Sequence, residues 1–210
     1  MVKGAVGAPT SRPLRRDAEL NLERILVAAQ DVFAEGGYDV SMEQIATRAG
    51  VGVGTLYRRF PNKESLLAAI VETAGGRARQ LAETVLAECA AEQGIFEFMR
   101  RCVGIPSSLR ALVSLSPRLA ETHLTMVALI APPVDRLLAR ARAAGAIRAD
   151  VTFSDIAVIL MSVRSVEDRC GEKQGERHLQ LLIDGLTPTT SALPHRPLPR
   201  AVLDELLIRG

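Results

Sequence analysis

The stretch that decides the fold is YDVSMEQIATRAGVGVGTLYRRFPNK, residues 38–63. Ser41 followed by Gln44 forms a capping-box pattern, which is typical of a helix start. Gly50-Val51-Gly52 supplies a turn, and a second short helix must end before Pro61, because proline cannot continue the helical hydrogen bonding. Two short helices joined by a tight turn form the unit that places a helix in a DNA groove.

The second half of this stretch is basic, although the whole chain of 210 residues has a net charge of only +2. No Asp or Glu lies between Glu43 and Glu64. The cations that we expect to neutralise DNA phosphates are Arg48, Arg58, Arg59 and Lys63. The alternative is an ordinary solvated face, and it applies most to Arg48, because the end of the first short helix often faces away from the groove.

Small and apolar residues open the second short helix. Val53 can pack on a thymine methyl group, and Gly52 permits a close approach of the backbone to DNA. Tyr57 stands between the inward-facing Leu56 and Arg58, so we expect its hydroxyl to reach a backbone phosphate. A dinucleotide-binding loop would need a preceding strand and a third glycine where this chain has Thr55.

The remainder of the chain predicts helices and no strand. An apolar stripe predicts a first helix that opens near Asp17 and stops at Gly36-Gly37 (Leu22, Ile25, Leu26, Ala29 and Phe33). Asn62 can cap a further helix that runs from Lys63 towards Glu88, weak or bent at Gly75-Gly76. Prolines are expected to mark boundaries or kinks beyond it (Pro106, Pro117 and Pro132-Pro133).

These elements predict an all-α protein with a three-helix DNA-binding head and a larger C-terminal helical bundle. We expect a disordered basic arm over residues 1–16 and a helix-turn-helix domain over 17–62. A larger helical body follows over 63–186, with 63–77 as the linking helix. Residues 187–210 form a Pro-rich C-terminal tail, whose last residues could add one or two amphipathic turns.

The composition limits the other classes of function. The three cysteines are far apart and lack a C-x-x-C spacing, which favours a reduced compartment. No apolar run reaches the ~18 residues of a membrane span, so we expect a soluble cytoplasmic protein. His123, His178 and His195 have no companion cluster, and we therefore expect no catalytic residue, metal or cofactor.

The chain resembles the TetR family of bacterial transcriptional repressors. The resemblance rests on ILVAAQDVFAEGGYDVSMEQIATRAGVGVGTLYRRFPNKESLLAAI, residues 25–70, and above all on TLYRRFPNKESLL, residues 55–67. ARAAGAIRADV (141–151) and HLQLLIDGLTP (178–188) fit more loosely. The resemblance implies an all-helical homodimer with a three-helix head and a helical body for ligand binding and dimerisation.

By position, the resemblance implies DNA backbone contacts at Thr55, Tyr57 and Arg59, with phosphates near Lys63 and near the helix capped by Ser41. The chain departs from the family where Gly52-Val53 replaces a common Ser-Lys pair and Arg59 replaces a common His. The candidate DNA-binding residues are Ser41, Arg48, Gly52, Val53, Gly54, Thr55, Tyr57, Arg58, Arg59 and Lys63.

Two further sets of residues are predicted in the body. We expect a mostly apolar cavity in segments 96–130 and 156–164, with polar groups for one end of a ligand; its residues are Phe96, Met99, Arg110, His123, Met126, Met161 and Arg164. We expect a four-helix dimer interface from the helices near 153–167 and 176–186; its residues are Ile156, Leu160, Val163, Leu179, Leu182, Ile183 and Leu186. Alternatively, both helices simply complete the core of one protomer.

Taken together, the sequence predicts a ligand-responsive repressor that binds a palindromic, double-stranded operator as a homodimer. A small apolar or amphipathic effector would release it. An activator or ligand-independent regulator of the same fold is an open alternative. A helical enzyme is the alternative from a different class, although no nucleophile-base pair or phosphate loop supports it.

Overall fold

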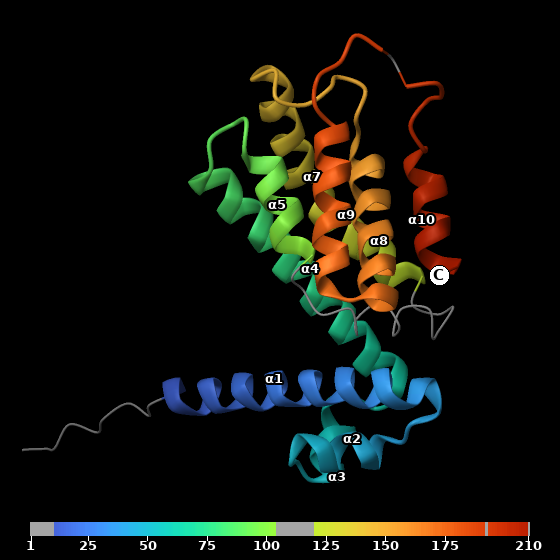
Figure 1. The fold of residues 1–210 in the computed structure, drawn as a ribbon. Coiled ribbons are helices and arrows are strands. Elements are labelled where there is room, and N and C mark those ends of the chain that lie inside the picture. Colours follow the sequence, from blue (N-terminus) through green and yellow to red (C-terminus); the bar gives the residue numbers. More distant parts are fainter. Residues whose placement is uncertain (1–10, 104–119, 192, 210) are drawn as a thin grey trace, which may run out of the picture.

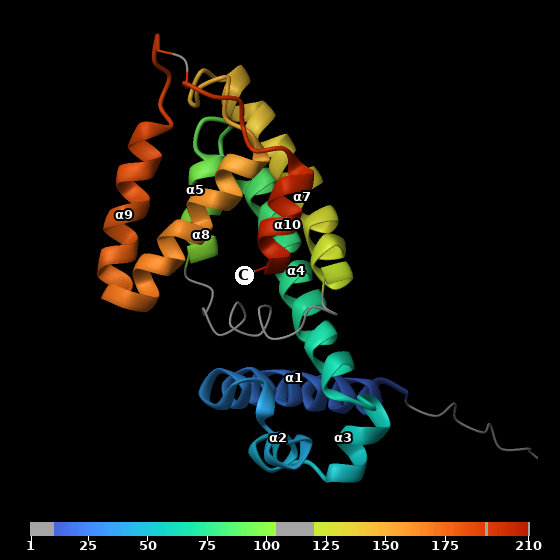
Figure 2. The same ribbon diagram turned by 90° about the vertical axis from the view of Figure 1, so that its right-hand side faces the viewer.

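The computed structural model describes residues 11–103, 120–191 and 193–209, which are helical and contain no strand in those ranges. A head built on α1, α2 and α3 lies at one end, and a helical body rises from it (Figures 1 and 2). The elements are α1 (Ser11–Gly36), the 3-10 helix η1 (Gly37–Asp39), α2 (Met42–Ala49), α3 (Val53–Arg59), α4 (Lys63–Glu88), α5 (Gly94–Val103), α7 (Ala120–Ala143), α8 (Phe153–Cys170), α9 (Glu172–Gly185) and α10 (Arg200–Arg209).

The caps predicted for the head are confirmed. The Ser41 hydroxyl accepts the backbone N–H of Gln44 at 3.2 Å, and the Gln44 side chain accepts the Ser41 N–H at 2.7 Å. Asn62 caps α4 in the same reciprocal way with Ser65. Gly50 ends α2 with φ 65°, a conformation that side chains with a Cβ rarely adopt. These local bonds fix where α2 begins and ends and where α4 begins.

The first helix begins earlier than predicted. α1 starts at Ser11, not near Asp17, so residues 11–16 of the predicted disordered arm are helical. Pro13 is compatible with this start, because the first turn of a helix leaves its N–H groups without intrahelical partners. The predicted end is confirmed, with Gly37 at φ 67°. Residues 1–10 of the predicted arm lie outside the described residues.

One continuous helix joins the head to the body, as the course of α4 in Figure 1 shows. Leu66 and Leu67 of α4 are buried in the head core, whereas Ala82 and Val85 are buried in the body core. The predicted course of this helix, from Lys63 towards Glu88, is confirmed, and the linking part named as 63–77 is its first portion. The last carbonyls of α4 are satisfied by the body, because Arg140 of α7 donates to the backbone oxygens of Leu86 and Cys89.

The two glycines in the middle of α4 do not interrupt it. Gly75 is buried, and a Cβ built on it would lie 2.6 Å from Cγ of Met126 on α7. A Cβ on Gly76 would have nothing within 4 Å. Gly75 therefore lies where α4 and α7 pack closely together, and the helix predicted to be weak there is held by its neighbour.

Pro132-Pro133 also lies inside a helix and not at a boundary, because α7 runs through it. The flanking Ala131 and Val134 are each buried to 1% exposure in the body core. Burial on both sides of the proline pair stabilises the helical path, although the pair removes backbone donors. Pro106 and Pro117 lie outside the described residues.

The C-terminal tail packs against the body, and its final helix is longer than the one or two turns expected. α10 packs against α7, where Leu203 is fully buried and Arg200 lies 3.5 Å from Asp135 (Figure 2). Before α10, the tail is tied to the α7–α8 connection: Arg148 donates to Asp150 at 2.6 Å, and the backbone N–H of Leu193 donates to the same carboxylate at 3.2 Å.

Candidate nucleic-acid interface

The outer surface of α3 is the candidate DNA-contacting surface. Leu56 is fully buried and Phe60 is 6% exposed, so these two side chains hold α3 on the head core. The opposite side of the helix is left exposed at Gly52, Val53, Gly54, Tyr57, Arg58 and Arg59, and Thr55 is half-buried. Within the described part of the chain, no ion pair involves Arg58 or Arg59. Both guanidinium groups are therefore available to an external anion.

Tyr57 is 41% exposed, and its hydroxyl donates to Oε1 of Glu43 on α2 at 3.2 Å. Partial loss of solvent and the charge of Glu43 raise the pKa of Tyr57. The pKa of Glu43 is lowered by hydrogen bonds from its own backbone N–H, from Ser41 and from Tyr57. The carboxylate is therefore ionised at neutral pH and lies beside the outer surface of α3.

Lys63 lies at the start of α4 and is half-buried. Its ammonium donates to the backbone oxygen of Tyr38 at 2.8 Å and lies 4.9 Å from the centre of the Tyr38 ring. The Tyr38 hydroxyl in turn donates to Glu64 at 2.5 Å. An ammonium has three donors, so the bond to Tyr38 fixes Lys63 in place and leaves donors for a phosphate.

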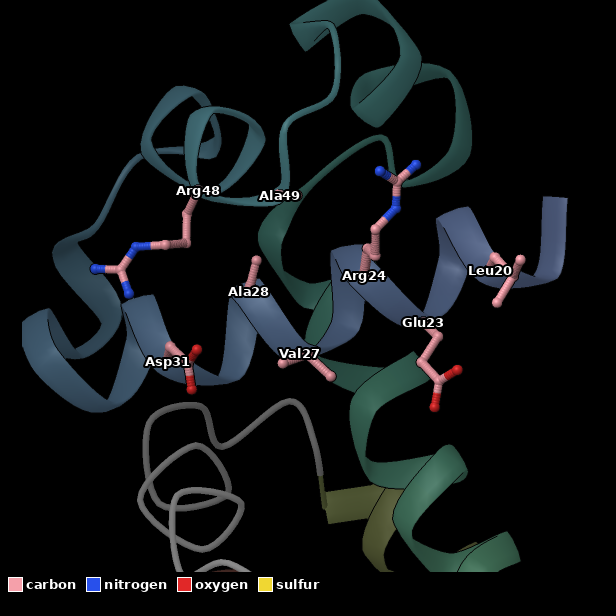
Figure 3. A pocket seen from close by; sticks show the side chains of 8 residues that line it. All are labelled: Leu20, Glu23, Arg24, Val27, Ala28, Asp31, Arg48 and Ala49. Carbon is pink, nitrogen blue, oxygen red and sulfur yellow. The ribbon is translucent and has the colours of Figure 1, made fainter. Parts of the chain in front are cut away.

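Arg48 is placed differently from the other predicted cations. Its guanidinium donates to Glu35 of α1 at 2.8 Å, and it points from α2 towards the last turns of α1 (Figure 3). The bond and the charge of Glu35, with a smaller contribution from Asp31, raise the pKa of Arg48. This placement favours the solvated-face alternative for Arg48.

The hollow drawn in Figure 3 is a surface groove along α1 that ends at α2, and it is separate from the cavity predicted in the body. Charged side chains surround its apolar floor, and Glu23 on its rim forms an ion pair with Arg77 of α4 at 3.2 Å. Its residues are Leu20, Glu23, Arg24, Val27, Ala28, Asp31, Arg48 and Ala49. The groove is thus lined by the head, and one ion pair links its rim to α4.

The residues predicted to line a body cavity are in several environments. Met99 is fully buried in the body core, and Met126 is half-buried against Gly75. Phe96 and Met161 are half-buried, whereas Arg110 and the His123 side chain lie outside the described residues. The cavity as a whole remains a prediction, because much of the segment 96–130 is not described.

Arg164 of α8, which was expected to face that cavity, has a backbone hydrogen-bond partner. Arg164 donates to the carbonyl oxygen of Cys102 near the end of α5, which ties α8 to α5. Burial raises the pKa of the Cys102 thiol to about 12, although the charge of Arg164 opposes this rise. Cys102 is therefore a neutral thiol near pH 7 and cannot act as a nucleophile there.

The burial of the predicted dimer residues favours the alternative that α8 and α9 complete the core of one protomer. Five of the seven are buried in the core of a single protomer: Ile156, Val163, Leu179, Ile183 and Leu186. Leu160 and Leu182 are half-buried and pack against the same core. The exposed apolar side chains of α8 and α9 are instead Val158 at 42% and Leu181 at 58%. Both helices therefore complete the protomer core and also carry outward-facing apolar side chains.

Glu43 is the residue of this surface that the sequence did not single out. It marks the edge of the acid-free segment, and nothing in its spacing shows that its side chain meets Tyr57. The contact joins residues 14 apart across the turn between two helices. A helical-wheel comparison of α2 and α3 with a known angle between them would have found it.

Comparisons with known proteins agree with this geometry. The family model described as bacterial regulatory proteins of the tetR family matches residues 25–70, and the C-terminal domain of SbtR-like transcriptional regulators matches residues 90–188. A TetR transcription regulatory protein from Mycobacterium vanbaalenii is 36% identical, with a TM-score of 0.65 over 84% of this chain and 100% of its own. The chain belongs to the TetR family of bacterial transcriptional regulators.

Other relatives are consistent with the TetR assignment. A TetR transcriptional regulator from Streptomyces coelicolor is 31% identical, with a TM-score of 0.58 over 80% of this chain and 99% of its own. An HTH-type transcriptional regulator of Staphylococcus aureus is 40% identical over 60 residues, which are 28% of this chain. The match spans only about a third, 32%, of that curated relative. The likeness to this relative therefore covers only a part of either chain.

The TetR assignment confirms the all-α fold and the helix-turn-helix head predicted from sequence. Both matched family models describe transcriptional regulators. In the ranges that the structure describes, no helix is long and apolar enough to span a bilayer.

Proposed function

We propose that this TetR-family protein is a ligand-responsive repressor that binds a palindromic operator as a homodimer. The observation that carries the proposal is the outer surface of α3, where Arg58 and Arg59 are exposed without ion partners in the described ranges, next to the half-buried Thr55. Guanidinium and hydroxyl groups donate to phosphate oxygens, and Val53 offers an apolar contact to a base edge.

The second part of the proposal is the assembly. Val158 and Leu181 are exposed on α8 and α9, which contact one another along their lengths. Exposed apolar side chains on adjacent helices favour burial against a symmetry mate. In the dimer, the two α3 helices would have to lie about 34–36 Å apart to enter successive major grooves.

The third part is release by an effector. Because α4 contributes to both cores, a ligand that prefers one arrangement of the body also shifts the head. A small apolar or amphipathic molecule is the class we propose. Among proteins of the same fold, FadR from Bacillus subtilis was crystallised with stearoyl-CoA. At 22% identity that likeness concerns the fold alone, so the effector proposal depends on the body cavity predicted above.

A selection from random duplex DNA tests the first part directly. The purified chain should enrich a palindromic sequence, and Arg58→Ala with Arg59→Ala should weaken its binding at least about 100-fold, since each phosphate contact adds counterion release. Arg79→Ala is the matched control, because Arg79 is an exposed cation of α4 outside α3. Absence of duplex binding even at low salt would refute the proposal. A reporter gene behind the enriched site then separates a repressor from an activator.

A further inference from the structure

The hydroxyl of Tyr57 can donate a single hydrogen bond, and in the free protein it donates that bond to Glu43. Both side chains are exposed, and the bond spans from α2 to α3 at 3.2 Å. A backbone phosphate that approached Tyr57 would be a second anionic acceptor for the same proton. The phenol cannot serve both acceptors fully, so the carboxylate and the phosphate compete for it.

Charge adds to this competition. Glu43 is ionised at neutral pH, because hydrogen bonds lower its pKa. It lies at the edge of a surface that carries Arg58 and Arg59, and no other acid lies between it and Glu64 in the sequence. A phosphate that reached Tyr57 would therefore come near a fixed negative charge, and the two would repel one another.

We propose that Glu43 sets the affinity of this protein for DNA by competing with a backbone phosphate for the Tyr57 hydroxyl. The proposal rests on the proposed DNA contact of α3. Glu43 acts through Tyr57 and is thus a positioning residue that holds the phenol in the free protein. Because phosphates carry no base identity, this competition weakens binding to every sequence alike and leaves the preference among sequences unchanged.

Fluorescence anisotropy with a labelled mixed-sequence DNA duplex at low salt tests the proposal. Glu43→Ala should tighten binding by about threefold to tenfold, the effect of one nearby unscreened charge and one freed donor. In a Tyr57→Phe background, the same substitution should tighten binding by only about twofold, because the donor is already lost. Rising salt should reduce both gains, since it screens the repulsion.

Asp39→Ala is the matched control. Asp39 is an exposed acid of the same head, whereas the Tyr57 hydroxyl donates its hydrogen bond to Glu43. The increase in DNA affinity caused by Asp39→Ala should be small, and it should be equal in the wild type and in the Tyr57→Phe variant. Glu43→Gln provides a second variant that removes the charge while keeping the side-chain length. It keeps the test valid if Glu43→Ala unfolds the start of α2.

A titration of the free protein tests the contact without DNA. The chain has only two tyrosines, so Tyr57 can be followed by phenolate absorbance against Tyr57→Phe. Removing Glu43 should lower the pKa of Tyr57, since the carboxylate contributes to its rise. An unchanged pKa, or an unchanged duplex affinity of Glu43→Ala, would overturn the proposal while wild-type DNA binding still stood. Failure of the wild type to bind any duplex would instead overturn the proposed function as well.

Discussion

Substituting the two adjacent glycines of α4 one at a time should change stability in opposite directions. Replacing glycine by alanine inside a helix ordinarily stabilises it by about 0.5–1 kcal/mol, because the unfolded chain loses freedom. Nothing lies within 4 Å of a Cβ built on Gly76, so Gly76→Ala should give this full gain.

Gly75→Ala brings the same gain in helix propensity, but its new methyl group contacts α7. The new methyl would lie 2.6 Å from Cγ and 3.5 Å from Cα of Met126. Met126 must then change rotamer or the two helices must separate, and overpacking of this kind costs about 1–3 kcal/mol. We therefore expect Gly75→Ala to destabilise by about 1–2 kcal/mol, so that the two variants differ by about 2–3 kcal/mol.

Urea and thermal unfolding followed by circular dichroism measure this difference. The protein concentration must be held fixed, because any dimerisation shifts the melting temperature. For a chain of this size, each kcal/mol moves the melting temperature by about 2–4 °C. Met126→Ala should rescue Gly75→Ala, since it removes the atoms that clash. Equal stabilisation by both glycine substitutions would refute the close packing of α4 on α7.

Three further outcomes follow from the structure. Lys63→Ala should lower the salt slope of DNA binding by about one unit for each protomer, and an unchanged slope in anisotropy would remove Lys63 from the phosphate contacts. Leu181→Glu should give a monomer of unchanged helical content in sedimentation, whereas Gln180→Glu, which adds the same charge on another side of α9, should not. Arg148 holds the pKa of Asp150 at about 2, below its usual 3.8, so its stabilising bond to the tail is present above pH ~4 and is lost as the pH falls towards 2. Asp150→Asn should remove this part of the acid dependence in denaturant titrations.

Much of the head was predictable from the sequence, because its determinants are local. Ser41 and Asn62 cap helices through bonds to residues three positions away, and Gly50 is the residue type that accepts a positive φ. Each of these signals acts within one helical turn. The inward-facing residues of α3 were likewise set by their spacing.

Predictions that a helix ends or weakens at a proline or glycine pair were less successful. Pro132-Pro133 and Gly75-Gly76 each weaken a helix in isolation, and both lie inside helices that neighbouring elements hold in place. The sequence analysis also assigned the apolar faces of α8 and α9 to a dimer interface. An apolar stripe in a sequence shows that a helix face is buried, but it does not show which neighbouring element buries it. Ile156 and Leu179 in fact face the protomer core.

The sequence by itself determined the class of fold, the helix-turn-helix head and the TetR family, because capping, helical spacing and a contiguous motif all act over short separations. Only the tertiary structure decided which charged and polar groups are free. Arg48 is bound by Glu35, 13 residues away, and Tyr57 is bound by Glu43, 14 residues away. Such contacts depend on the angle at which two helices meet. That angle is set by the packing of the whole head, and no residue spacing records it.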